Sequence, residues 1–179
     1  MFNRTITTGA VAGALTAIVL GAAPAVAATA ITPDAAEGTQ QADLLKVKTV
    51  NEAGLRVRLT FDDIRRSGAR YSQGVTVFVD TDASRKGPEL AMTGGLNTGT
   101  DYQLVRVRHW QLAQTPLSCS YRLTLDWRHD VAIARIGDDC LGDHSAVRVG
   151  ARVNETHQGT RTADWLVARR ALVGPVAQG

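Results

Sequence analysis

Apolar and polar residues alternate with a period of two along most of the chain from Leu44 onward. The clearest run has Leu55, Val57, Leu59 and Phe61 in one phase, with arginine and threonine in the other. Successive side chains of a strand point to opposite faces of a sheet, so this pattern predicts strands with one buried face.

About nine strands are expected. Two pairs form hairpins: residues 45–50 return through 51–54 into 55–61, and residues 120–127 return through 128–130 into 131–136. The other expected strands span residues 75–79, 89–93, 102–110, 146–153 and 165–167. Only residues 62–66 suggest a short helix. Many short strands between turn residues favour an all-β fold, an antiparallel two-sheet β-sandwich of the jelly-roll kind.

The N-terminus is expected to lie outside the domain. Arg4, the uncharged run that follows it and the small residues Ala25 to Ala27 are typical of a secretory signal peptide over residues 1–27. The mature protein is therefore predicted to be secreted, with cleavage near Ala27 and no membrane span in the mature chain. Residues 28–42 are predicted to be a flexible leader. Residues 43–179 are predicted to be a single domain.

Charge and cysteine content narrow the picture further. Cleavage after residue 27 removes one arginine and leaves 152 residues with 19 basic and 17 acidic side chains. That balance is too even to predict a nucleic-acid partner. Cys119 and Cys140 lie just outside the two ends of the second hairpin. In an oxidising compartment an even cysteine count predicts a structural disulfide between them.

An acidic loop follows the strand at residues 75–79. Asp80, Asp82 and Ser84 offer oxygen ligands at alternate positions, and Glu89 can add a carboxylate if the loop folds back. Such ligands suit a hard cation, so Ca²⁺ is the expected ion. The loop departs from an EF-hand, because it lacks the glycine and the final glutamate of that motif. The alternative, which the frequency of Asx turns favours, is that Asp80 and Asp82 accept hydrogen bonds from nearby backbone amides in a turn.

A resemblance to known modules rests on Val77–Asp82, Gly87–Glu89, Gly94–Leu96 and Gly99–Leu104. This stretch resembles secreted actinobacterial β-sandwich proteins and, more distantly, carbohydrate-binding family 9 and DOMON modules. Those modules share a strand that ends in an acidic turn and is followed by an Asp-x-Tyr strand. The tryptophans that grip sugars in the first family and the Met and His haem ligands of DOMON modules have no matched positions in this chain. The resemblance therefore supports the fold more than the ligand.

Tryptophans are the candidates for sugar stacking, because an aromatic face suits the apolar face of a sugar ring. Trp127 shares the apolar phase of its strand and is expected in the core. If Val105 and Val107 point inward, then Arg106, Arg108 and Trp110 lie on the outer face. Together with Trp165, these three are the expected ligand-binding residues. The alternative is that both tryptophans pack in the protein, as large aromatic residues usually do.

Arginines recur in the outward phase of several strands, as the pairs Arg56 and Arg58, Arg106 and Arg108, and Arg148 and Arg152. If these strands adjoin in one sheet, the pairs form a basic stripe able to hold an anionic polysaccharide or cell-wall polymer. The alternative is a solvated face with acidic neighbours. Strand order decides between them.

No catalytic residues are predicted. The chain has no HExxH, Gly-x-Ser-x-Gly or glycine-rich phosphate motif. Asp139, Asp143, His144 and Ser145 lie close in sequence, which does not establish triad geometry. The expected function is that of a secreted, non-catalytic binding module for extracellular or cell-wall carbohydrate. A small secreted hydrolase and a secreted inhibitor or wall-associated interaction protein remain the alternatives.

Overall fold

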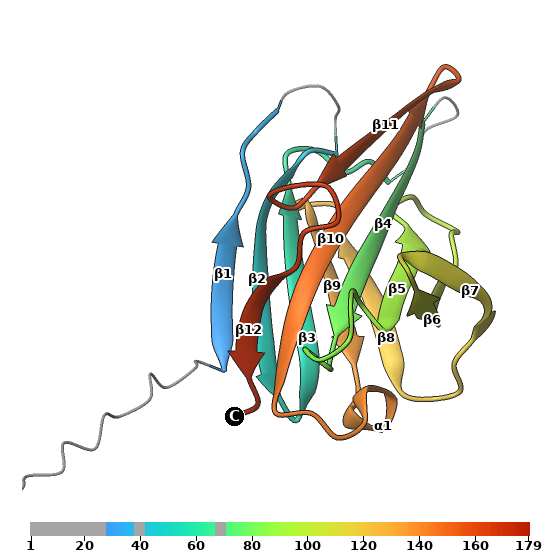
Figure 1. The fold of residues 1–179 in the computed structure, drawn as a ribbon. Helices are drawn as coiled ribbons and strands as arrows, with labels where there is room; N and C mark the ends of the chain where they lie inside the picture. The colour runs from blue at the N-terminus through green and yellow to red at the C-terminus, as the bar shows by residue number, and fades with distance from the viewer. Residues whose placement is uncertain (1–27, 38–41, 67–70) are drawn as a thin grey trace, which may run out of the picture.

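Two antiparallel β-sheets pack face to face in the computed structural model (Figure 1), which describes residues 28–37, 42–66 and 71–179. The predicted all-β, two-sheet sandwich is confirmed. The described residues form twelve strands, more than the nine expected. The expected signal peptide lies outside the described residues, so secretion stays a prediction.

The first sheet has five strands in the order β1-β2-β3-β9-β8. Their bounds are β1 Thr29–Pro33, β2 Leu44–Glu52, β3 Gly54–Phe61, β8 Tyr121–Asp126 and β9 Val131–Ile136. Both predicted hairpins, β2-β3 and β8-β9, are present. Gly54 makes the first hairpin turn with φ +90°, and a Cβ there would lie 2.8 Å from the carbonyl oxygen of Ile136, so the position requires glycine.

The second sheet has the order β11-β10-β4-β5-β6-β7, and β12 also pairs with β10. Its strands are β4 Tyr71–Asp80, β5 Leu90–Gly95, β6 Tyr102–Arg108, β7 Gln111–Pro116, β10 Ala146–His157, β11 Thr160–Trp165 and β12 Val173–Ala177. A short helix, α1 Asp138–Leu141, follows β9. No helix in the described part of the chain is both long and apolar enough to cross a membrane.

The main core fills the space between the sheets. It is built from the inward phase of each strand, including Val57 and Leu59 of β3 and Val77 and Val79 of β4, all of which are fully buried. Burying one such side chain contributes about 1.5–3 kcal/mol. Trp127 packs against this core and donates its indole N–H to the carbonyl of Leu96 at 2.7 Å, in agreement with its predicted core phase.

The leader prediction is wrong for Thr29–Pro33, which form β1 and pair with β2 along five positions. This strand is held by backbone hydrogen bonds and by Ala30 against the core, so it needs little apolar surface of its own. Strands β7 and β12 are also outside the nine expected. Five of the six side chains of β7 are exposed, so its sequence carries no period-two signal.

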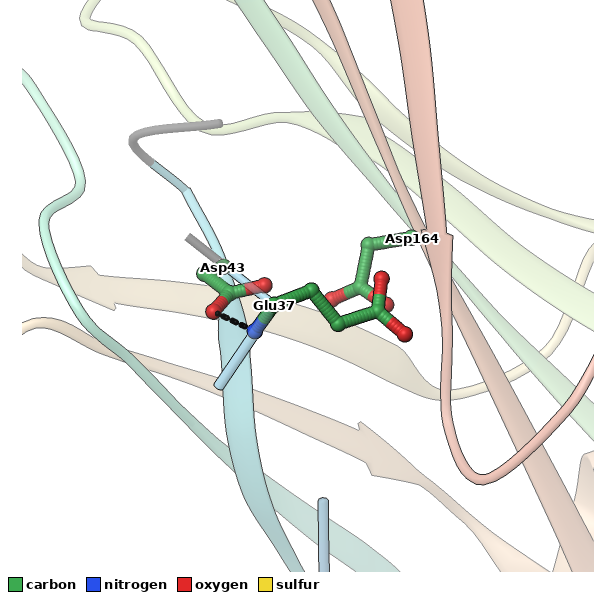
Figure 2. A group of neighbouring side chains, drawn as sticks. All are labelled: Glu37, Asp43 and Asp164. Atoms are coloured by element: carbon green, nitrogen blue, oxygen red, sulfur yellow. Dashed lines mark hydrogen bonds between the residues drawn. The ribbon is translucent and has the colours of Figure 1, made fainter. Parts of the chain in front are cut away.

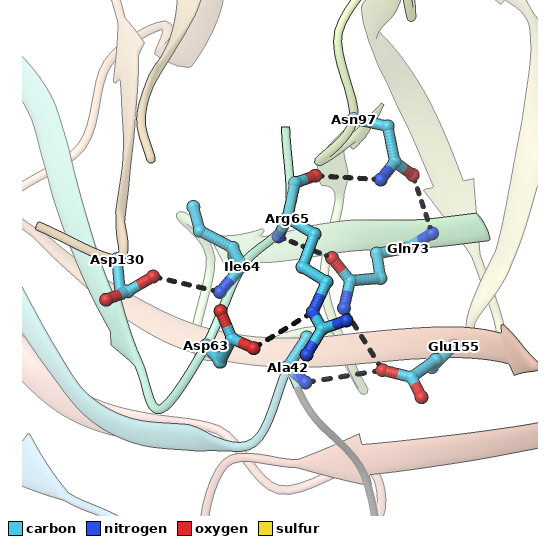
Figure 3. Close-up of polar contacts among 8 residues, drawn as sticks. All are labelled: Ala42, Asp63, Ile64, Arg65, Gln73, Asn97, Asp130 and Glu155. Carbon is cyan, nitrogen blue, oxygen red and sulfur yellow. Dashed lines mark hydrogen bonds and ion pairs between the residues drawn. The ribbon is translucent and has the colours of Figure 1, made fainter. Parts of the chain in front are cut away.

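The predicted helix over residues 62–66 is also wrong. Figure 3 shows that side chains from elsewhere in the chain take up the backbone groups of this segment. The N–H of Ile64 donates to Asp130 Oδ1 at 3.0 Å, and the N–H of Arg65 donates to Gln73 Oε1 at 3.1 Å. The carbonyl of Arg65 accepts from the Asn97 side chain at 2.9 Å. Because these backbone N–H and carbonyl groups are paired with side chains, they do not form the hydrogen bonds of a helix.

The predicted disulfide between Cys119 and Cys140 is present and joins the start of β8 to α1. The cross-link closes a loop with a sequence separation of 21 residues around the β8-β9 hairpin. We expect replacement of both cysteines by alanine to lower the free energy of unfolding by about 3 kcal/mol, because the unfolded chain regains loop entropy. Urea unfolding of the oxidised protein and the double variant tests this. Equal midpoints with equal slopes would contradict it.

Candidate functional site

The acidic loop after β4 is closed by its own hydrogen bonds. Asp80 is 1% exposed and forms an ion pair with Arg148, which lies opposite it on β10. Asp80 Oδ1 also accepts the N–H of Asp82 at 3.2 Å, and Asp82 Oδ1 accepts both the N–H and the hydroxyl of Ser84. Glu89 folds back as expected and accepts the N–H of Thr81 at 2.9 Å. These are the contacts of the turn interpretation, while Ca²⁺ binding by Asp80, Asp82, Ser84 and Glu89 stays a prediction.

A different set of acids gathers where the chain enters β2. Carboxylate oxygens of Glu37, Asp43 and Asp164 lie within 4.8 Å of one another (Figure 2). Asp43 and Asp164 are buried, and each accepts a backbone N–H: Glu37 N–H to Asp43 Oδ2 and Leu44 N–H to Asp164 Oδ2, both at 2.8 Å. The acids thus hold the chain at the start of β2 against β11.

Burial raises the pKa of Asp164 from 3.8 to about 6. The hydrogen bond from Leu44 lowers this pKa, whereas the charges of Asp34, Asp43 and Glu37 raise it further. At neutral pH the folded protein therefore carries a desolvated carboxylate among other acids, which costs stability.

The sequence cluster around His144 is engaged in structural contacts. His144 Nδ1 lies 2.9 Å from the carbonyl of Gly142, and its Nε2 lies 3.1 Å from the side-chain oxygen of Asn51. Asp139 accepts the N–H of Ser120 at 2.8 Å. The imidazole thus contacts Gly142 and Asn51, while the Asp139 carboxylate holds the start of β8.

The two tryptophans expected to bind ligand lie together on the outer side of the second sheet. Phe78 is buried there, with its ring centroid 5.0 Å from that of Trp110 and 5.7 Å from that of Trp165. Arg152 lies over Trp165, 5.4 Å from its ring centroid. Both tryptophans are half-buried and pack on a small apolar cluster that also contains Val107.

Arg106 and Arg108 do not join these tryptophans. Val105 and Val107 pack in the small outer cluster with Trp110. Arg106 and Arg108 occupy the opposite phase of β6 and are exposed. The four expected ligand-binding residues therefore lie on two sides of the second sheet, and the pairing of Arg106 and Arg108 with Trp110 on one face is wrong.

Strand order does not meet the condition for a single stripe made of the three arginine pairs. Arg56 and Arg58 belong to the first sheet, whereas the Arg106, Arg108, Arg148 and Arg152 positions belong to the second. One member, Arg148, is held by Asp80. The six residues cannot form one surface, because the two sheets pack against each other through their inner faces.

Strand order instead assembles a basic face on the outside of the first sheet. Arg56 of β3 lies opposite Arg135 of β9, which lies opposite Arg122 of β8. Two residues further along the sheet, Lys48 of β2 lies opposite Arg58 of β3. We use the term basic face for the exposed side chains of Lys46, Lys48, Arg56, Arg58, Arg122 and Arg135.

The cations of the basic face are not neutralised within the described residues. None of the six takes part in the ion pairs or side-chain hydrogen bonds that the structure contains there. The nearby acids are Glu52, at the end of β2, and Asp126, which contacts His129 at 2.7 Å. The Asp139 carboxylate accepts a hydrogen bond from the backbone N–H of Ser120. Like charges directly opposite one another destabilise a sheet, so the arrangement costs stability.

A groove lies at the end of the basic face next to α1. It has a volume of about 490 Å³, within the range of small-molecule sites. Arg56, Arg122 and Arg135 line it together with Glu52 and Tyr121. Val50, Leu55 and Ile136 also line it, the last two from strands whose apolar side chains face the main core. We refer to this feature as the arginine groove.

The sequence analysis identifies Arg56 and Arg58 but not the other four residues of the basic face, Lys46, Lys48, Arg122 and Arg135. Arg122 and Arg135 stand in the outward phase of the predicted β8-β9 hairpin, so the hairpin register alone places them side by side. Their proximity to Arg56 depends on the pairing of β3 with β9, across about 75 residues of chain, which alternation does not reveal.

Comparisons of the chain with models of protein families, with curated proteins and with solved structures found no match. The resemblance to carbohydrate-binding and DOMON modules therefore stays an expectation.

We expect Asp164→Asn to stabilise the protein at pH 7 by roughly 1–3 kcal/mol, because the variant no longer holds a buried carboxylate whose pKa is raised from 3.8 to about 6. The amide keeps an oxygen for the Leu44 N–H. The folded-state pKa is raised, so the native carboxyl adds stability below pH 4, and that stability is lost as the pH rises to about 6.

Urea unfolding of both proteins at pH 4, 5, 6 and 7, in EDTA, measures this difference. The difference in the free energy of unfolding between variant and wild type should widen from pH 4 to pH 6 and then stay constant. The other carboxyl groups are the same in both proteins, so their titration does not contribute to this difference. A gap that does not change with pH would contradict the assignment of the raised pKa to Asp164.

Proposed function

We propose that this chain is a non-catalytic binding module for an acidic polysaccharide outside the cell, which it binds through the basic face. One observation carries the proposal. Like charges stand directly opposite each other at Lys48 and Arg58, at Arg56 and Arg135, and at Arg122 and Arg135, with no described acid paired to them. Local arrangements that cost stability are expected at functional sites.

The layout of the basic face favours a polymer over a single ion. Neighbouring strands lie about 4.8 Å apart, and side chains on one face recur about every 7 Å along a strand. The cations therefore form a two-dimensional array over β2, β3, β9 and β8. A polymer with an acidic group on each unit can contact several of them at once, which raises its overall affinity.

Polysaccharide is favoured over nucleic acid by three features. The expected mature chain has a nearly even charge balance, and the expected secretory signal puts it where polysaccharides are exposed. The basic face is the surface of a sheet, without a helix to enter a nucleic-acid groove. A neutral sugar gripped between tryptophans is less favoured, because Trp110 and Trp165 are packed on Phe78.

We expect the mature protein to bind polygalacturonate, an acidic polysaccharide, and not neutral dextran. Arg56→Gln with Arg135→Gln should weaken polygalacturonate binding by about tenfold or more, because two adjacent cations are lost. Binding of the wild type should also weaken as salt is raised, because salt screens exposed charges. Affinity electrophoresis or biolayer interferometry at two salt concentrations measures both effects.

The matched control is Arg106→Gln with Arg108→Gln, which removes the same charge from the other sheet. We expect this control to bind within about twofold of wild type, after correction for the small long-range effect of net charge. Equal losses in the two double variants would show binding to net charge alone and would overturn the role of the basic face. Failure of the wild type to bind any acidic polysaccharide, including cell-wall polymers, would overturn the proposal itself.

Glu52→Gln is expected to act in the opposite direction. Glu52 lines the arginine groove and repels an acidic ligand, so its neutralisation should strengthen polygalacturonate binding about two- to fivefold at low salt. The same measurement with Glu37→Gln, an exposed acid at the other end of β2, supplies the control. An unchanged or weaker affinity for Glu52→Gln would contradict binding in the groove.

A further inference from the structure

The arginine groove differs from the rest of the basic face in shape. Lys46, Lys48 and Arg58 stand on the open surface of the sheet, whereas Arg56, Arg122 and Arg135 line a hollow of about 490 Å³. The turn at Glu52 to Gly54 bounds this hollow on one side, and Ser120 and Gly137 bound it on another. Sites for small ligands are hollows of this size with few polar groups and apolar walls.

We propose that the arginine groove binds one carboxylate-bearing sugar unit of the polymer, and that the polymer then runs along the strands toward Lys48 and Arg58. This inference rests on the proposed function, because it assigns the specificity of the same surface. It names the ligand chemistry as a uronic acid unit, one that combines a carboxylate with a ring that has an apolar face.

The three guanidinium groups account for the carboxylate. A guanidinium presents a planar fork of N–H donors that matches the two oxygens of a carboxylate, and a lysine does not. Arg135 is the central member, with Arg56 opposite it on one side and Arg122 opposite it on the other. These donors have no protein acceptor within the described residues, so they are available to a ligand.

The rest of the groove wall is mostly strand backbone and core residues. Val50 stands opposite Arg56, in the outward phase of β2, and is 5% exposed. Leu55, Ile136 and Tyr121 also line the groove, but their side chains take the inward phase and pack on the main core, with the Tyr121 ring 6.2 Å from that of Tyr102. The selectivity of the groove therefore rests on its three guanidinium groups.

Charge sets the direction of the polymer. Beyond the groove toward α1, the chain carries Asp138 and Asp139, and Glu52 lines the groove itself. In the other direction, two residues along the strands, Lys48 and Arg58 continue the positive surface. An acidic polymer is repelled on the α1 side and attracted on the other, so its further units lie over β2 and β3.

The test compares a short ligand with a long one. Galacturonate, a single unit, occupies the groove, whereas polygalacturonate also reaches Lys48 and Arg58. Arg135→Lys keeps the charge and removes the planar fork, so we expect it to weaken galacturonate binding about tenfold or more. Lys48→Gln should leave galacturonate binding within about twofold and weaken polygalacturonate binding at least threefold. Isothermal titration calorimetry measures both ligands, and thermal unfolding confirms that each variant is folded.

The outcomes separate this inference from the proposed function. Binding of polygalacturonate without binding of galacturonate, or equal galacturonate affinity in wild type and Arg135→Lys, overturns the groove and leaves the basic face intact. Tighter binding of a sulfated or phosphorylated monosaccharide than of galacturonate overturns the carboxylate assignment. Binding of DNA or anionic vesicles in place of all these sugars overturns both proposals.

Discussion

The alternation of side chains along each strand is the constraint on which the rest of this structure depends. Once Val57 and Leu59 face the core, Arg56 and Arg58 must face outward, because a shift by one residue would exchange the two sets. The same rule sends Arg135 outward from β9, where Ala134 and Ile136 are buried. The core therefore sets the register, and the register brings the cations of neighbouring strands into contact.

The outer faces of the two sheets differ in what covers them. On the second sheet Phe78 is buried beneath Trp110 and Trp165, so this face is covered by the protein itself. On the first sheet the corresponding face carries exposed lysines and arginines. A sheet face with cations directly opposite one another on neighbouring strands is destabilised, whereas a face on which positive and negative side chains alternate is not. The difference between the two faces is the reason to look for a ligand on the first sheet.

Alternation predicts the sandwich and the two hairpins, and the even cysteine count predicts the disulfide that closes the second hairpin. Alternation was not sufficient for strands whose side chains are mostly exposed, such as β7, or for Thr29–Pro33, which is held by backbone pairing with β2. The segment around Ile64 was misassigned as helical because its amides are paired with Asp130 and Gln73, which lie elsewhere in the fold (Figure 3). Such contacts between distant segments leave no mark on local sequence.

The candidate site likewise depends on contacts between segments that are far apart in the sequence. Arg56 was recognisable as an outward residue, but a groove requires Arg122 and Arg135 beside it, and they come from a hairpin that follows more than sixty residues later. The tryptophans were misleading for a related reason. Trp110 and Trp165 lie at strand ends, yet β4 is buried on both faces from Val75 to Asp80, and both rings pack on Phe78. Burial of a strand on both faces indicates a second covered face, so the cations of the uncovered sheet are the stronger evidence for a binding surface.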